Sequence, residues 1–163
     1  MAELDLLELL SADHQKLLDE HPPSVSELAQ HLGVERELLF PLIRRYACDG
    51  DAIVGALRAD ERLLEEGMAD LERGRDAPEG VEQESTVAEA LRAHVQTLEP
   101  LFSRLRRELP VEMLIRSARS VPLSIGAAPT HAHPRLSEGG PMSEIAEDVA
   151  SVSDHVRDRL RPR

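Results

Sequence analysis

Hydrophobic residues recur every three or four positions in four separate stretches of the chain, which is the spacing of one face of an α-helix. The four stretches are residues 4–20, 24–46, 51–73 and 86–108. The prolines of His21-Pro22-Pro23 end the first stretch, and Pro41 is expected to bend the second. Four amphipathic helices with short connections predict an all-α protein that folds as an antiparallel four-helix bundle.

The remainder of the chain has a different pattern. A short fifth helix is expected over residues 111–119, followed by a segment rich in proline and glycine. We therefore predict a bundle over residues 1–119, a linker over 120–141 and a C-terminal amphipathic helix or tail over 142–163. If that last helix holds a protein partner, its apolar residues Ile145, Val149 and Val152 would make the contacts.

Ionisable residues interrupt the apolar stripes at a few positions. His14, His31 and His94 each lie on the apolar face of a different helix, and Asp60 lies on that of the third. Glu35 shares the face of His31, because side chains four residues apart stack on a helix. Glu99 follows His94 by five residues and would turn inward only if Pro100 distorts the helix.

Burying such groups is costly unless something satisfies them, and a bound metal ion is one solution. A single histidine on an apolar face is more often a hydrogen-bonded core residue, but three on three helices favour a metal site, intact or relict. Imidazole and carboxylate together suit iron, manganese or zinc. The candidate metal ligands are His14, His31, Glu35, Asp60, His94 and Glu99. The other histidines lie outside the stripes and are not expected to be ligands.

Charge and composition restrict the function further. The net charge of −12 opposes binding to nucleic acid or to an anionic membrane. Cys48 is the only cysteine, the N-terminal residues lack a signal-peptide pattern, and no apolar run could cross a bilayer. These features predict a soluble cytoplasmic protein. The sequence shows no nucleophile triad, phosphate-binding loop or cofactor lysine, so we do not expect a conventional enzyme.

The order of the motifs resembles the hemerythrin-like (HHE cation-binding) family. The matching residues are Asp13-His14, His31 with Glu35 and Leu39-Phe40-Pro41, and His94-Val95 with Glu99 and Leu101-Phe102. The linker 128–134 and the ending 154–160 are similar to those of actinobacterial members. The resemblance implies a four-helix bundle with a non-haem di-iron centre that binds oxygen or nitric oxide, or senses redox state.

The chain departs from the family in the third helix. The family has a histidine within a pattern such as E-H-A-E, whereas this chain has Arg58-Ala59-Asp60-Glu61. Asp60 would be the substitute ligand. The resemblance therefore implies a modified or partly lost site that holds two irons, one iron or no metal. Without metal, the protein would be a regulatory module that binds a protein partner.

Residues 24–46 also permit a different interpretation, as a DNA-binding helix-turn-helix. Ala29, Gly33 and Val34 have the small, turn-forming and apolar character that this motif requires. In one continuous helix, Gly33 would cost about 1 kcal/mol. Against DNA binding, Glu35 and Glu37 would lie at the start of the recognition helix. The sequence leaves open whether this segment is one bent helix or two.

Overall fold

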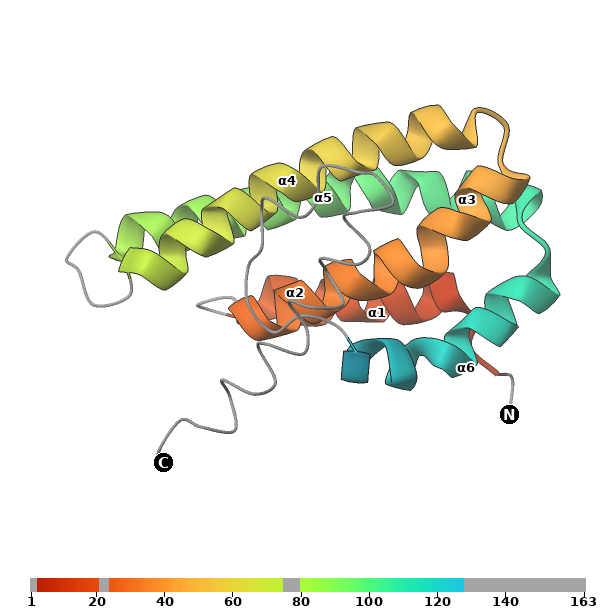
Figure 1. Cartoon of the computed structure of the whole chain (residues 1–163), viewed down its shortest axis with the longest axis horizontal. Helices are drawn as coiled ribbons and strands as arrows, with labels where there is room; N and C mark the ends of the chain where they lie inside the picture. Colours follow the sequence, from red (N-terminus) through yellow and green to blue (C-terminus); the bar gives the residue numbers. More distant parts are fainter. Residues whose placement is uncertain (1–2, 21–23, 75–79, 128–163) are drawn as a thin grey trace.

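The structure, a computed structural model, is all-helical in the residues that it describes, which are 3–20, 24–74 and 80–127 (Figure 1). The all-α class is therefore confirmed for these ranges. The elements are α1 (Leu6–Asp19), α2 (Val25–Val34), η1 (Glu35–Leu39), α3 (Phe40–Tyr46), α4 (Gly50–Gly74), α5 (Gly80–Glu108) and α6 (Val111–Ala127). The predicted helix 142–160, with its contact residues Ile145, Val149 and Val152, lies outside the described residues.

The first two helices begin at side chains that cap them. Asp5 accepts a hydrogen bond from the backbone N–H of Glu8 at 3.0 Å, and the Glu8 carboxylate accepts one from the N–H of Asp5 at 2.9 Å. This reciprocal capping box satisfies two backbone donors at the start of α1. Ser24 accepts a hydrogen bond from the N–H of Glu27 at the start of α2.

Residues 25–46 form one continuous helical run. Val34 and Glu35 have helical dihedrals, and Gly33 is buried inside the run, so no turn interrupts it there. The widened π-helical turn η1 follows, in which the N–H of Phe40 donates to the carbonyl of Glu35. Pro41 comes next, and its ring would crowd the carbonyl four residues earlier in a regular α-helix. The π turn accommodates this proline. Because the chain is helical at Gly33, the helix-turn-helix interpretation of residues 24–46 lacks the turn that it requires.

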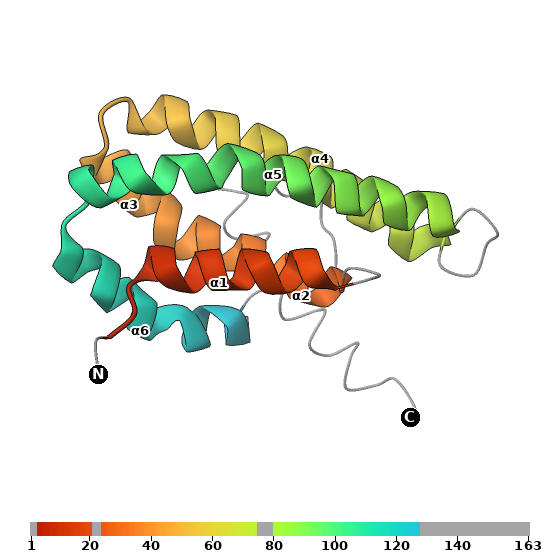
Figure 2. The same ribbon diagram turned by 180° about the vertical axis from the view of Figure 1, so that it is seen from behind.

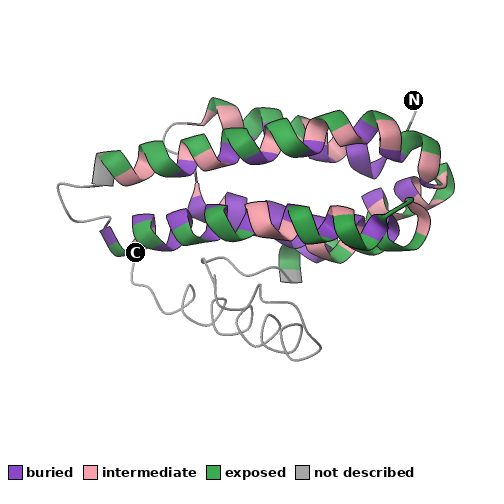
Figure 3. Ribbon diagram, turned by 90° about the horizontal axis from the view of Figure 1, so that it is seen from above, coloured by how far each residue is buried: buried purple, intermediate pink, exposed green. Residues whose placement is uncertain are grey.

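The helices lie side by side along most of their length. In Figures 1 and 2, α4 and α5 run next to each other, α1 and α2 lie beneath them, and α6 packs against α1 and α2. Buried residues line the facing sides of the helices, whereas exposed residues cover the outside (Figure 3). No helix in the described ranges is both long and apolar enough to span a membrane.

Two helices are longer than the sequence pattern predicts. The helix α5 begins at Gly80 rather than near residue 86, and α6 continues to Ala127 rather than to residue 119. The end of α6 is fixed by tertiary contact, because the hydroxyl of Ser124 donates to the Glu37 carboxylate. Local composition, including Pro122, therefore underestimates the length of α6, and the predicted linker boundary at residue 120 falls inside a helix.

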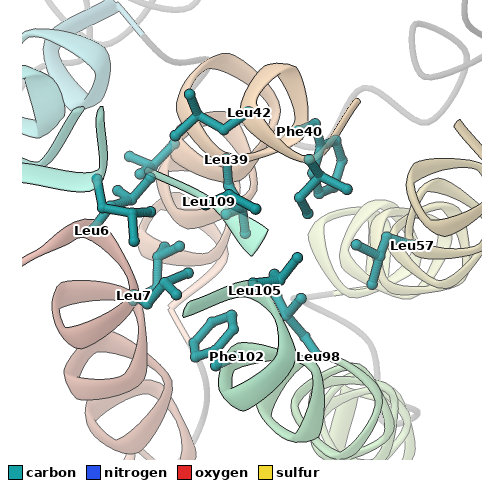
Figure 4. Close-up of a cluster of buried hydrophobic side chains, with 14 of the residues drawn as sticks. Leu6, Leu7, Leu39, Phe40, Leu42, Leu57, Leu98, Phe102, Leu105 and Leu109 are labelled. Carbon is teal, nitrogen blue, oxygen red and sulfur yellow. The ribbon is translucent and has the colours of Figure 1, made fainter. Parts of the chain in front are cut away.

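The apolar core consists of two separate clusters. The larger one joins α1, the η1–α3 region, α4, α5 and α6, and Figure 4 shows how its leucine and phenylalanine side chains meet. The second cluster joins α1, α2, α4 and α5 through Leu17, Leu28, Leu64 and Leu91 among others. On α1, α4 and α5, the residues that lie between the two clusters include the buried ionisable residues His14, Glu61 and His94. A buried polar layer therefore divides the core.

Candidate metal centre

Four side chains form the centre of this polar layer. His14 comes from α1, His31 from α2, Glu35 from η1 and His94 from α5. They are 1%, 2%, 0% and 1% exposed, respectively. On α1, His14 stands between the core residues Leu10 and Leu17, so the apolar spacing that buries the helix also directs the imidazole inward. Helix packing thus brings three imidazoles and one carboxylate to a common interior position.

The three imidazoles meet at one oxygen of the Glu35 carboxylate. Oε1 of Glu35 lies 3.4 Å from Nε2 of His14, 3.1 Å from Nε2 of His31 and 3.3 Å from Nε2 of His94. One ligand atom from each of the four residues can be chosen so that all lie within 4.8 Å of one another. These distances are those of a group that can hold a metal ion.

The inward-facing atoms of this group have no hydrogen-bond partner within the described part of the chain. They are Nε2 of each of the three histidines and both carboxylate oxygens of Glu35. Buried polar atoms are normally hydrogen-bonded, so several unpaired ones at the same place require an explanation. A cation in contact with them would satisfy all of them together, because each has a lone pair to offer.

The outward-facing nitrogens of two rings contact carboxylates. Nδ1 of His14 lies 2.8 Å from Oε1 of Glu99, whose carboxylate also accepts a hydrogen bond from the Ser11 hydroxyl. Nδ1 of His31 lies 2.7 Å from Oδ2 of Asp13. A carboxylate at Nδ1 favours the tautomer that is protonated there, which leaves the Nε2 lone pair directed inward. Metal-binding histidines have this arrangement of neighbours.

In the absence of a cation, the charges of Glu35, His31 and His94 shift one another's pKa values. Burial would raise the pKa of Glu35, but the charges of His94 and His31 outweigh it and hold this pKa well below its usual value. Burial would lower the pKa of His31, yet the charge of Glu35 and the hydrogen bond that the ring donates to Asp13 raise it to about 10. The pKa of His94 is raised against its burial as well, mainly by Glu35. Protons therefore take the place of a cation in this layer.

Of the six candidate ligands from the sequence, four come together in this group: His14, His31, Glu35 and His94. Glu99 lies behind the group, on the far side of the His14 ring. The helix α5 runs through Pro100 as a helix, so Glu99 reaches α1 from a continuous helix. Asp60 is half-buried on α4 and is not among the clustered ligand atoms.

The fully buried acid of α4 is instead Glu61, which is not among the six ligands predicted from the sequence. The guanidinium of Arg36 donates to Oε2 of Glu61 at 2.8 Å. Burial raises the pKa of Glu61 to about 7, although Arg36 lowers it. The spacing of the apolar residues on α4 could have identified Glu61. The buried residues of this helix are separated by four, three and four positions, and they are Leu57, Glu61, Leu64 and Met68. That heptad spacing includes residue 61 and excludes residue 60.

Comparisons of the chain with protein-family models, with curated proteins and with solved structures give no match. The geometry of the site is therefore what indicates a function. Within the described residues, this site is a buried group of three imidazoles and one carboxylate that can bind a metal ion.

Proposed function

We propose that this protein binds a metal ion, with iron as the metal, in a hemerythrin-like four-helix bundle. Nε2 of His14, His31 and His94 and the carboxylate of Glu35 would hold the ion. The observation that carries the proposal is the convergence of three buried, unpaired Nε2 atoms on one carboxylate oxygen. Neighbouring carboxylates at Nδ1 of two of these rings support it.

The choice of iron rests on the ligand set and on the resemblance of the motifs. Iron accepts imidazole and carboxylate ligands together, as zinc and manganese also do. The ordered motifs around His14, His31 and His94 resemble those of the hemerythrin-like family, which favours iron among these metals. Bound iron would supply affinity for oxygen or nitric oxide and a reversible change of oxidation state. Binding or sensing of these molecules is the role we propose.

The protein's own residues would prepare the site in two ways. Asp13 and Glu99 orient the imidazoles of His31 and His14 and increase the electron density on their Nε2 atoms. The two apolar clusters on either side enclose the buried side chains of His14, His31, Glu35 and His94, which strengthens the electrostatic contacts among them. These residues hold and insulate a cation, and we assign no catalytic step to them.

The hemerythrin-like bundle would be a modified one. In this proposal α1, the run from α2 to α3, α4 and α5 form the antiparallel bundle, and α6 is an addition that packs against α1 and α2. The third helix, α4, contributes the carboxylates Glu61 and Glu65 to the interior, whereas the family has at least one histidine on this helix. Both contact Arg36, and in this proposal the site has no imidazole ligand on this side.

Elemental analysis of protein expressed with added iron tests this proposal. We expect iron in the wild type and its loss in His31→Ala, because that variant removes one of the three imidazoles. Leu91→Ala is the matched control, since Leu91 of α5 is buried to a similar extent as His31 but offers no ligand atom. A folded wild type that contains no metal, or a His31→Ala variant that keeps all its metal, would contradict the proposal.

The other interpretations of the sequence find less support. A metal-free module would have to balance the buried Glu35 carboxylate with protons on the imidazoles, whose Nε2 atoms make no hydrogen bond within the described residues. A helix-turn-helix would require a turn at Gly33, where the chain is helical.

A further inference from the structure

A second buried charge cluster lies on the α4 side of the polar layer. Two carboxylates of α4, Glu61 and Glu65, point into the interior with side chains that are 0% and 6% exposed. They are four residues apart and therefore on the same face of the helix. Arg36 of η1 lies against both of them, with its Nε 2.8 Å from Glu61 and its terminal nitrogen 2.7 Å from Glu65.

Arg36 is the residue that follows Glu35, yet the two side chains serve different clusters. Glu35 contacts the three imidazoles, whereas Arg36 contacts the two carboxylates of α4. The clusters are neighbours, because Glu35 and Arg36 are consecutive residues of η1 and Arg36 contacts Glu61 directly. The interior therefore contains two adjacent anionic positions, and one of them is already filled by a guanidinium.

The carboxylate pair retains unused capacity to bind a cation. Oε1 of Glu61 and Oε2 of Glu65 are buried and have no hydrogen-bond partner within the described residues. Carboxylate oxygens are the ligands that hard divalent cations take. A guanidinium neutralises such a pair with a fixed charge, because its pKa is too high for it to lose its proton. Arg36 and a divalent cation thus compete for the same carboxylates.

We propose that the Arg36 guanidinium occupies a second cation position, formed by Glu61 and Glu65, and thereby limits the metal centre to one ion. This inference rests on the proposed function, since it concerns how many ions the same interior holds. It predicts that the carboxylate pair is a latent site for a divalent metal, which becomes available when the guanidinium is removed.

Native mass spectrometry in the presence of excess Co²⁺ counts the bound ions directly. We expect one ion in the wild type and two in Arg36→Met, which keeps the length of the apolar stem and removes the charge. Arg36→Lys keeps a positive charge and should still bind one ion. Adding Glu61→Gln and Glu65→Gln to Arg36→Met should return the count to one, because the latent ligands are then neutral amides.

The possible counts separate this inference from the proposed function. Two ions in the wild type, or one ion in a folded Arg36→Met, overturns the inference and leaves the metal centre in place. No ion in the wild type overturns the proposed function itself. Circular dichroism checks that each variant folds. Arg36→Gln replaces Arg36→Met if the latter does not fold, and the count of the wild type can overturn the inference in either case.

Discussion

Oδ2 of Asp13, on α1, lies 2.7 Å from Nδ1 of His31, on α2. Because this carboxylate accepts the Nδ1 proton, the other nitrogen of the ring is the one that faces Glu35 and the remaining histidines. Asp13 also fixes the angle of the ring, since it comes from a different helix. One contact between two helices therefore determines both the tautomer and the orientation of a candidate ligand.

Removing this contact should weaken metal binding without removing a ligand. We expect Asp13→Ala to lower the affinity for Zn²⁺ by about 10- to 100-fold, the usual effect of losing a carboxylate behind a metal-binding histidine. Competition against a chromophoric chelator measures it. Asp19→Ala, at an exposed position of the same helix, is the control and should bind as the wild type does. Equal affinities for both variants would show that Asp13 does not support the site.

Metal binding should release protons at neutral pH. His31 has a pKa of about 10 in the absence of a cation, and the pKa of His94 is also raised. A metal ligand must be a neutral imidazole, so the ion displaces these protons. Titration calorimetry at pH 7, in two non-coordinating buffers of different ionisation enthalpy, should show release of at least one proton per ion. A binding enthalpy that is the same in both buffers would contradict this.

The stability of the metal-free protein should decrease as the solution becomes more alkaline. The pKa of His31 rises from about 6.5 in the unfolded chain to about 10 in the fold. Its charged form therefore stabilises the fold fully below pH 6.5, and this contribution is lost as the pH rises toward 10. Urea unfolding followed by circular dichroism at pH 7 and pH 9.5 should show the decrease.

The variant His31→Gln is the control for this pH dependence. It lacks the titrating ring, so its free energy of unfolding should change less between the same two pH values. A metal-free wild type whose stability rises from pH 7 to pH 9.5 would contradict the assignment.

Much of the candidate site could be predicted from the apolar stripes. Those stripes place His14, His31 and His94 inward on three helices, and the spacing of four residues adds Glu35. Which acid of α4 faces the interior is harder to predict from the sequence. Asp60 and Glu61 are both acids, and neighbouring residues differ by only about 100° around a helix. Only the heptad register of the buried positions distinguishes them.

Other features depend on tertiary contacts that no local pattern contains. Asp13 is half-buried and contacts a histidine of the next helix, so its role depends on how α1 and α2 pack. The extension of α6 to Ala127 has the same origin, because its apolar side packs on α1 and α2 and outweighs the presence of Pro122.

The burial of Glu61 leads to a prediction about stability. Glu61→Ala leaves the Arg36 guanidinium without one of its two carboxylates in the interior. Losing a charged hydrogen bond in the interior costs about 1.5–3 kcal/mol, and Glu65 still neutralises the guanidinium. Asp60→Ala is the control at the next position, and it should change the free energy of unfolding by less than about 1 kcal/mol. Urea unfolding of both variants gives the comparison, and equal losses would contradict the assignment of Glu61 as the buried acid.

Diffraction from crystals of the iron-loaded protein, collected at the iron absorption edge, would locate the metal ion. We expect one anomalous peak, enclosed by Nε2 of His14, His31 and His94 and by the Glu35 carboxylate, at about 2.0–2.2 Å from these atoms. A peak at any other position in the chain, or none among these four side chains in protein that contains iron, would contradict the account.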